Sequence, residues 1–335
     1  MNAEISTPAW HLYDFDDPQQ QSILLQLGES DYRAASFLDQ RVEALAKQRR
    51  ELPLHELQDT LGVATRPARC IFHLGHCGST LLSRALAASP NVLPLREPLT
   101  LRRLAAEPAA RHLLPLVLSA HTRVFHPAQV AMIKASSVCN QLIDPLLRHH
   151  PDSRAILLYV PLETHLAGML GKLTSPVDLS AQAKSKLADW RAITGAAPLE
   201  VEDLDTTQLA VLAWLTSMYF LLAAAGSFPQ QALLLDFEVM LVDAEASLVR
   251  CASFMGLGPK LEGETNAILA AWPEISTSYS KQPDLPYSAF NRRKTLQRGR
   301  STRRDDIKRG MNWAKALVSA TAKPAGSQSL EQFFS

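Results

Sequence analysis

The chain has almost no excess of charge of either sign. Its 335 residues include 34 lysines and arginines against 33 aspartates and glutamates, which gives a formal net charge of +1. Because nucleic-acid-binding proteins usually carry a strong basic excess, the whole-chain charge predicts no nucleic-acid partner. A chain of this length can bury a large core, and length alone predicts roughly two domains.

Cysteine is scarce, and its spacing excludes the common cysteine motifs. No Cys-x-x-Cys pair occurs, and three of the four cysteines lie in apolar stretches, a pattern typical of reduced thiols in a cytoplasmic protein. His73, His149 and His150 have no metal-ligand spacing to other donors, so no bound metal is expected. The four cysteines are Cys70, Cys77, Cys139 and Cys251.

Sequence signals for secretion and for membrane insertion are also weak. The first residues, MNAEISTPAWHLYDFDD, lack a basic n-region and an apolar h-region, so no secretory signal is expected. The longest apolar stretch, residues 209–226, reaches only the lower edge of membrane-spanning length and contains Thr216 and Ser217. We interpret it as a buried core helix and expect no stable membrane insertion, with peripheral membrane contact as the minor alternative.

The N-terminal residues 1–65 are predicted to form a helical extension. One or two amphipathic helices are expected there, starting after Ser30 and interrupted at Pro53. Such helices also offer a surface for self-association, which makes a homo-oligomer one expectation. The remainder divides into an α/β domain over 66–275 and a basic C-terminal tail or flap over 276–335.

A helical insert is predicted inside the α/β domain, at about residues 163–226. Two or three helices fit its apolar pattern. Its polar stretch 172–186, KLTSPVDLSAQAKSK, is interpreted as a loop or a lid. Residues 99–127 are also predicted to be helical.

The most informative stretch is residues 69–98, RCIFHLGHCGSTLLSRALAASPNVLPLREP. Its pattern predicts a buried strand, a tight loop at Gly75 and Gly78, a helix opened by Ser79 and Thr80, and a second strand that ends in an acid. Such a loop directs several N–H groups and the positive end of a helix at one point, which suits a phosphate or sulfate group. An ordinary strand, turn and helix is the alternative.

The loop departs from the nucleotide-hydrolase pattern. Gly-x-x-x-x-Gly-Lys-Ser/Thr places a lysine directly after its second glycine. Here Gly75 and Gly78 are only three residues apart, and Ser79 follows. Hydrolysis of ATP or GTP is therefore disfavoured.

The loop resembles that of the sulfotransferase family, which binds the 5′-phosphosulfate end of 3′-phosphoadenosine 5′-phosphosulfate (PAPS). In that family a strand is followed by a basic residue, Ser, Gly, Ser/Thr, Thr and a Leu-rich helix. His76 stands where the family has the basic residue, and Cys77 stands where it has the serine. The matching residues are Gly78, Ser79, Thr80, Leu81, Leu82, Ser89, Pro90, Arg96, Glu97 and Pro98.

Two later stretches, residues 130–170 and 233–258, resemble further blocks of the same family. In the first, a strand ends in Lys134, as in the family. The family's next strand ends in Arg-Asp-Pro, and that Arg, with a Ser in the following helix, holds the 3′-phosphate of the donor. Here only Pro161 survives, and the Ser position falls at or near Ala167.

The resemblance implies a fold, a donor and a reaction. The implied fold is α/β, a P-loop NTPase-like three-layer fold with a central parallel sheet and added helices. The implied co-substrate is PAPS, and the implied reaction transfers its sulfuryl group to a hydroxyl or amine of a small-molecule or peptide acceptor. Two alternatives stay open: a kinase-like group transferase that uses ATP and magnesium, and a non-catalytic nucleotide-binding or regulatory protein.

Sulfuryl transfer requires charge neutralisation, alignment of the reactants and a general base. Glu97 is the candidate base because it follows a predicted strand at the ligand-binding edge; a structural acid paired with Arg96 or Arg102 is the alternative. Lys134 would stabilise the leaving phosphate, unless it is a surface lysine. His76 stands where a cation is expected, so its protonation should strengthen donor binding, unless the side chain lies outside the site.

The donor-binding residues are expected to come from the loop, from the turn after Lys134 and from the tail. Ser79 and Thr80 can both bind the donor and cap the helix. Cys77 is either a thiol with a lowered pKa or a small residue that fills the loop, and the second is favoured. The predicted donor-binding residues are Gly75, His76, Cys77, Gly78, Ser79, Thr80, Leu81, Ser137, Lys281 and Arg292.

Lysine and arginine concentrate in residues 279–310 of the tail. Most charge runs are simply solvated. Here Tyr279 and Tyr287 interleave with the charges, so Lys281 and Arg292 are expected to fold back over the site. Guanidinium groups bind phosphate well, which would replace the missing 3′-phosphate ligands.

Overall fold

The centre of the computed structural model is a parallel sheet made from short apolar runs. Nearly every residue of its strands is buried, as expected for a sheet that is covered on both faces. The model describes residues 4–62, 66–171, 175–195, 199–257, 261–277, 289–320 and 330–335. Within these ranges the sheet has five strands: β4 (Arg69–His73), β5 (Val92–Arg96), β6 (Val130–Lys134), β7 (Arg154–Tyr159) and β8 (Ala232–Asp236).

The strand order, β5-β6-β4-β7-β8, makes β4 the switch point of the sheet. The chain leaves β4 for the outer strand β5, returns through β6, and then crosses to β7 and β8 on the other side. Cys70 of β4 is level with Ile133 of β6 and Ala155 of β7, and all of these pairings are parallel. Open α/β sheets bind ligands at the carboxyl ends of their strands beside the switch point, which here means the loop after β4.

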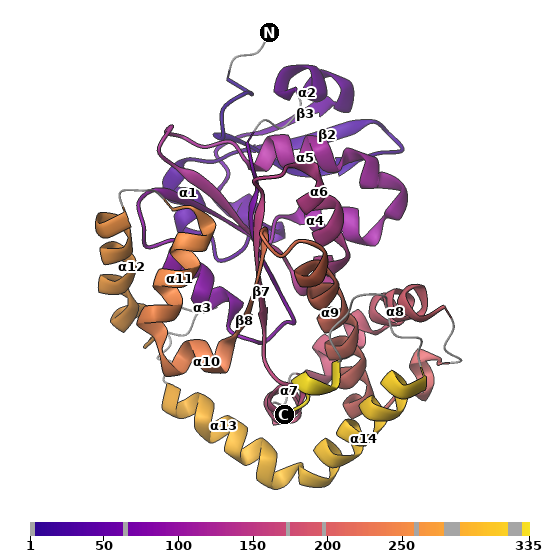
Figure 1. Cartoon of the computed structure of the whole chain (residues 1–335). Helices are drawn as coiled ribbons and strands as arrows, with labels where there is room; N and C mark the ends of the chain where they lie inside the picture. The colour runs from indigo at the N-terminus through magenta and orange to yellow at the C-terminus, as the bar shows by residue number, and fades with distance from the viewer. Residues whose placement is uncertain are drawn as a thin grey trace.

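Helices cover both faces of this sheet (Figure 1). On one face, α3 packs against α11 and α12; on the other, α9 packs against β4, β7, β8 and α6. The predicted three-layer α/β fold is therefore confirmed. The bounds are α3 (Ser79–Leu86), α6 (Ile143–His149), α9 (Thr206–Ser227), α11 (Ala244–Met255) and α12 (Leu261–Ile275).

Helix α9 is a core helix, as the sequence predicts. Among the described residues it is the one helix long and apolar enough to cross a membrane by length and composition, yet 67% of its most apolar window is buried inside the protein. Asp205 and Gln208 form a capping box at its start. The indole of Trp214 donates a hydrogen bond to the carbonyl of Val160 at 2.9 Å, which fixes the helix to the end of β7.

The prediction of a purely helical N-terminal extension is wrong. Its main element is a three-stranded antiparallel sheet of β1 (Trp10–Asp16), β2 (Gln21–Gln26) and β3 (Arg49–Pro53). A tight turn joins β1 to β2, in which the N–H of Gln20 donates to the carbonyl of Asp17 at 3.0 Å. The residues of β3 lie in a stretch that the sequence predicts to be helical, but here they pair with β2. Among its described residues, 4–62, the α-helices are α1 (Glu29–Ala34) and α2 (Leu54–Leu61).

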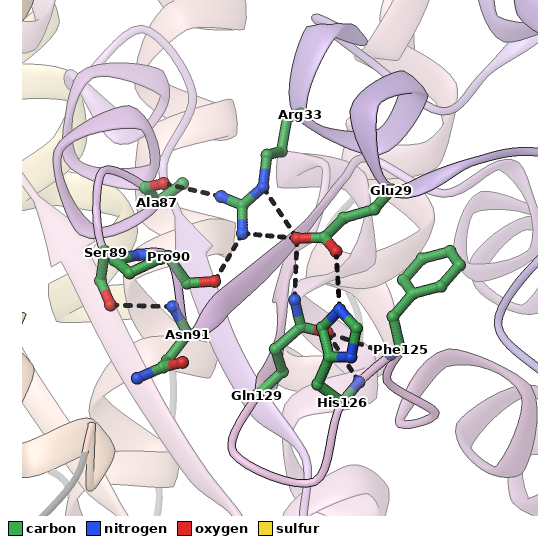
Figure 2. A network of polar contacts seen from close by, with 9 residues as sticks. All are labelled: Glu29, Arg33, Ala87, Ser89, Pro90, Asn91, Phe125, His126 and Gln129. Atoms are coloured by element: carbon green, nitrogen blue, oxygen red, sulfur yellow. Dashed lines mark hydrogen bonds and ion pairs between the residues drawn. The ribbon is translucent and has the colours of Figure 1, made fainter.

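A polar network around Glu29 fixes this segment to the parallel sheet (Figure 2). Arg33 donates to the Glu29 carboxylate at 2.9 Å and to the carbonyls of Ala87 and Pro90 at 3.3 and 2.6 Å. The side-chain amide of Gln129 donates to the same carboxylate at 2.8 Å. These groups come from α1, from the end of α3 and from the turn before β6. The N-terminal segment is therefore built onto the α/β core, and its buried side chains join the same hydrophobic cluster.

The predicted insert is helical, but its polar stretch is not a loop. Helix α7 (Leu162–Leu170) is followed by α8 (Ser175–Thr194). Leu179, Ala183 and Leu187 of α8 are buried at a spacing of four residues, so one face of this helix packs against the core. The expectation of a loop or lid is therefore wrong from Ser175 onward.

The basic tail folds as two packed helices, α13 (Ala289–Thr302) and α14 (Arg304–Ala320). Helix α13 approaches α7 so closely that a Cβ on Gly299 would lie 2.1 Å from the carbonyl oxygen of Ala167. Helix α14 packs on α9 and α7. At the end of the chain Phe334 is buried and its carbonyl accepts from the N–H of Glu163 at 3.0 Å. The described residues 289–320 and 330–335 thus pack against the α/β core.

Candidate functional site

The loop after β4 has a backbone conformation suited to an anion. Gly75, His76 and Gly78 have φ angles of 84°, 52° and 84°, in the left-handed region that favours glycine. The first intrahelical bond of α3 runs from the N–H of Leu82 to the carbonyl of Gly78 at 3.1 Å. The N–H groups of the first three helical residues, Ser79 to Leu81, therefore precede the helical ladder and belong to the helix end that attracts anions.

Glycine is required at position 78 for two reasons: its φ angle is positive, and a neighbouring side chain leaves no room for a Cβ. A Cβ at this position would lie 2.1 Å from the ring of Phe237. Phe237 is buried and opens the short helix α10 (Phe237–Val242) directly after β8. The second glycine of the loop and the aromatic residue after β8 therefore form one packed unit.

His73, the last residue of β4, orients the start of the loop. Its Nδ1 accepts a hydrogen bond from the N–H of Gly75 at 2.9 Å. Its Nε2 must then carry the proton, which it donates to the carbonyl of Ala135 at 3.0 Å. His73 is thus a structural residue of the loop. No group of three or more His, Cys, Asp or Glu side chains that could hold a metal ion occurs in the described parts of the chain.

Cys77 fills the loop and is not an activated thiol. It is fully buried, with its Sγ 3.5 Å from the carbonyl of Leu158. Burial raises the pKa of the Cys77 thiol to about 11, although the positive charges of Lys134 and Arg292 oppose the shift. The alternative of a lowered pKa is therefore wrong. The side chain of Leu81 also lies in the core, so this residue can offer a donor only its N–H group.

Glu97 and Lys134 lie side by side at the carboxyl edge of the sheet. Arg96 and Lys134 are register partners, and the N–H of Glu97 donates to the carbonyl of Lys134 at 2.7 Å. The Lys134 ammonium bonds the Glu97 carboxylate. The Lys134 side chain is 2% exposed and that of Glu97 16% exposed, so this lysine is not a surface residue. Arg96 and Arg102 bond other groups, so the structural pairings considered for Glu97 are not the ones observed.

The backbone at Glu97 is held in an unfavourable conformation. Its φ is 52°, and the three described non-glycine residues with positive φ are Gln20, His76 and Glu97. Such a conformation costs on the order of 1–3 kcal/mol and concentrates at functional sites. Two of the three residues that adopt it are predicted catalytic residues.

The N-terminal segment supplies the contacts that hold Glu97 in place. The N–H of Leu38 donates to the carbonyl of Arg96 at 2.6 Å, and the carbonyl of Leu38 accepts from the N–H of Leu99 at 3.1 Å. The neighbouring Phe37 ring lies 5.5 Å from the Lys134 ammonium. Residues on both sides of Glu97 are thus paired with the N-terminal segment, for which the sequence predicts no role in the site.

Helix α13 brings Arg292 to the loop. The Arg292 guanidinium bonds the carboxylate of Glu238 and lies 5.0 Å from the centre of the Phe237 ring, which packs on Gly78. Lys281 lies outside the described residues. The structure therefore places one of the two predicted tail cations beside the loop.

The 3′-phosphate ligands expected from the family are absent at their usual positions in the described chain. Strand β7 ends in Tyr159, and Ala167 is covered by α13 through Gly299. Arg300 of α13 bonds Glu163 at 3.1 Å. The C-terminal helices therefore occupy the region in which the family has its serine.

Ser137 contacts the loop from the other side. It opens the 3₁₀ turn η3 (Ser137–Leu142), and its hydroxyl lies 3.2 Å from the point where a Cβ on Gly75 would be. The carbonyl of Ser137 accepts from the ammonium of Lys186 at 3.1 Å, and Ser217 Oγ accepts from the same ammonium at 3.0 Å. Burial lowers the pKa of Lys186 to about 8.

A cavity of about 810 Å³ opens beside Glu97. Its walls come from β1 and β2, the segment 39–43, α4 (Leu99–Ala106), η3 and α8. Glu97 lines this cavity and is bonded to Lys134, whose charge also acts on Cys77 of the loop. The candidate acid thus lines a space large enough for a small molecule, and its partner Lys134 ends the strand that neighbours β4 and its loop.

Several site residues were not predicted from the sequence. The sequence offers a sign of Phe237, because an acid and an aromatic residue, Asp236 and Phe237, stand at the end of the last strand. Phe37, Arg41 and Lys186 had none, because each reaches the site only through contacts between distant parts of the chain.

No protein-family model and no curated protein sequence matches the chain. Among solved structures it is similar to the sulfotransferase from Alicyclobacillus acidocaldarius, with 14% identity, 62% of this chain and 93% of that chain covered, and a TM-score of 0.35. It is also similar to the sulfotransferase domain from the curacin biosynthetic pathway (11% identity, 80% and 95% covered, TM-score 0.38). A third similar structure is the sulfotransferase domain from the Synechococcus PCC 7002 olefin synthase (16% identity, 78% and 97% covered, TM-score 0.39).

All three of these structures are sulfotransferases, the class that the sequence resembles. The chain itself has an α/β fold, with a parallel five-stranded sheet and a glycine loop after its central strand.

Proposed function

We propose that this protein is a sulfotransferase that moves a sulfuryl group from PAPS to a hydroxyl or amine acceptor. The observation that carries the proposal is the Glu97–Lys134 pair at the carboxyl edge of the sheet, where β6 neighbours β4 and Glu97 lines the 810 Å³ cavity. In this proposal the loop after β4 is the donor side, the cavity is the acceptor side, and Glu97 is the proton acceptor.

The donor would lie with its phosphosulfate on the loop. N–H groups from His76 to Thr80, with the Ser79 and Thr80 hydroxyls, would bind its 5′-phosphate and sulfate. Arg292 lies beside this loop. Both Arg292 and Lys281, which comes before Arg292 in the basic tail, are proposed to replace the missing 3′-phosphate ligands. His76 would add a positive charge when protonated.

Glu97 and Lys134 would have different roles in the reaction, one as a base and the other as a positive charge. The acceptor oxygen or nitrogen forms a bond to sulfur as the bond from sulfur to the phosphate oxygen breaks, and 3′-phosphoadenosine 5′-phosphate (PAP) leaves. Glu97 takes the proton of the acceptor. The Lys134 ammonium would stabilise charge on the leaving phosphate.

Calorimetry with PAP, ADP and ATP–magnesium tests the donor assignment. Wild type should bind PAP in preference to both comparators, and Ser79→Ala should bind PAP more weakly because one hydroxyl ligand is lost. Preference for ATP–magnesium would favour the kinase-like alternative. Binding of none of the three would contradict the proposal and favour a non-catalytic protein.

A further inference from the structure

The cavity beside Glu97 has charged groups of both signs in its walls. Five carboxylates and four guanidinium groups line it, and the ammonium of Lys134 is bonded to one of the carboxylates, that of Glu97. The charges of the lining therefore nearly cancel. Most small-molecule pockets contain only a few polar groups, so this number of charged side chains is unusual.

Ion pairs within the walls fix most of these groups. Asp39 accepts from Arg41 at 2.7 and 2.5 Å and lies 3.8 Å from Arg102. Arg103 donates to the two carboxylate oxygens of Asp14 at 3.0 and 3.1 Å. An acceptor with a net charge would compete with one partner of these ion pairs, whereas a neutral acceptor leaves the pairs intact.

The apolar part of the lining is about as large as the polar part, but it holds few large side chains. It comes from side chains such as Leu99, Val138 and Ala181, and Tyr13 is the one aromatic residue among the described lining residues. The Tyr13 hydroxyl is itself bonded to Glu43. A hydrocarbon chain or a flat polycyclic acceptor would remove water from ion pairs without replacing its hydrogen bonds.

We propose that the acceptor is a neutral polyhydroxylated molecule, of the saccharide or polyol class. The proposal rests on the proposed function, because it identifies the molecule that Glu97 would deprotonate. A hydroxyl group donates to a carboxylate and accepts from a guanidinium at the same time, so neighbouring hydroxyls match the edges of the Asp39–Arg102 and Asp14–Arg103 pairs. Arg102 is 42% exposed and at ion-pair but not hydrogen-bond distance from Asp39, so its N–H groups can turn to such a ligand.

Saturation-transfer NMR in the presence of PAP tests this class directly. The probes are glucose, N-acetylglucosamine, maltose and inositol as neutral polyols, with glucuronate, glucosamine and 2-naphthol as anionic, cationic and apolar comparators. At least one neutral polyol should bind more tightly than every comparator. Arg102→Gln should weaken that binding by about tenfold, as expected for loss of a charge-assisted hydrogen bond.

The control is Arg148→Gln, which removes an exposed guanidinium paired with Asp144 on α6 and should leave polyol binding unchanged. Tighter binding of any comparator, binding of no polyol, or equal polyol binding by Arg102→Gln would overturn the inference. PAP binding measured in the same samples separates the two proposals. If PAP binds and the polyols do not, the acceptor class alone fails; if PAP does not bind, the proposed function fails.

Discussion

At the scale of single residues, the pair formed by Glu97 and Lys134 links stability to the proposed chemistry. The two side chains differ in burial, 2% exposed for Lys134 and 16% for Glu97. A buried ion pair gains little over an apolar pair, but removal of one partner leaves the other charge poorly compensated. The loss should therefore be greater when the more deeply buried charge is the one that remains.

Glu97→Gln should consequently lower the free energy of unfolding more than Lys134→Met does. We expect a loss of about 3 kcal/mol for Glu97→Gln and a smaller loss for Lys134→Met. Urea unfolding of the two variants and the wild type gives the comparison. Equal losses, or a larger loss for Lys134→Met, would show that burial of the ammonium does not set the energy of this pair.

Lys186 predicts a pH dependence of stability. Burial lowers its pKa to about 8, so between about pH 8 and 10.5 the unfolded chain binds more protons at this group than the folded chain. Its contribution to stability therefore rises with pH across that window, by up to about 3 kcal/mol in total.

The measurement compares wild type with Lys186→Met by urea unfolding at pH 7.5 and pH 9.5. Buried thiols such as Cys77 lower the free energy of unfolding at high pH, because the unfolded chain ionises them more easily than the folded protein does. Both proteins contain these thiols, so this effect cancels in the difference. The free energy of unfolding of the wild type should rise relative to that of Lys186→Met as the pH increases. A constant difference would mean that the ammonium is not held in a desolvated site.

Among the elements, α13 is proposed to supply the 3′-phosphate contacts that the sequence resemblance would place at the end of β7. Arg292 faces Phe237 and the loop, whereas its neighbour Arg293 is exposed. Arg292→Gln should weaken PAP binding by about tenfold or more, because a charged hydrogen bond to phosphate is lost, while ADP binding changes less. Arg293→Gln is the matched control. Calorimetry that finds the two variants alike would exclude α13 from the donor site.

Point variants test this element better than truncation does. Removal of everything after Ser280 would also remove Gly299, Gly310 and Phe334, which pack against α7 and α9. The packing of these residues was not visible in the sequence, in which the basic residues dominate the pattern. A loss of donor binding on truncation would therefore not distinguish a lost ligand from a damaged core.

The elements differ in how far the sequence predicts them. The unit from β4 to β5 is predicted well, since its apolar runs, glycines and helix-opening residues all lie within 69–98. The N-terminal sheet is not, because β3 pairs with β2 across more than twenty intervening residues and its short strand has exposed positions. The segment 37–39 lacks any regular pattern, yet its contacts position Glu97.

Over the whole molecule the net charge is close to zero, but the positive charge is unevenly distributed along the chain. The stretch from Arg292 to Arg309 contains nine basic and two acidic residues, so it carries a net charge of +7 in a chain whose total is +1. The two C-terminal helices that hold it lie along the edge of the molecule to which α7 and α10 belong (Figure 1). A local positive field of this kind attracts anionic ligands such as the proposed donor.

Glu97 is proposed to act as the base for sulfuryl transfer from PAPS bound at the glycine loop. The decisive experiment incubates the wild type and Glu97→Gln with ³⁵S-labelled PAPS and a protein-free metabolite extract, and measures PAP binding on both proteins. We expect a labelled product for the wild type, and at least a hundredfold less for Glu97→Gln at unchanged PAP affinity, the size of effect expected when a general base is removed. Equal labelling by the two proteins, or no labelling by a wild type that binds PAP, would contradict it.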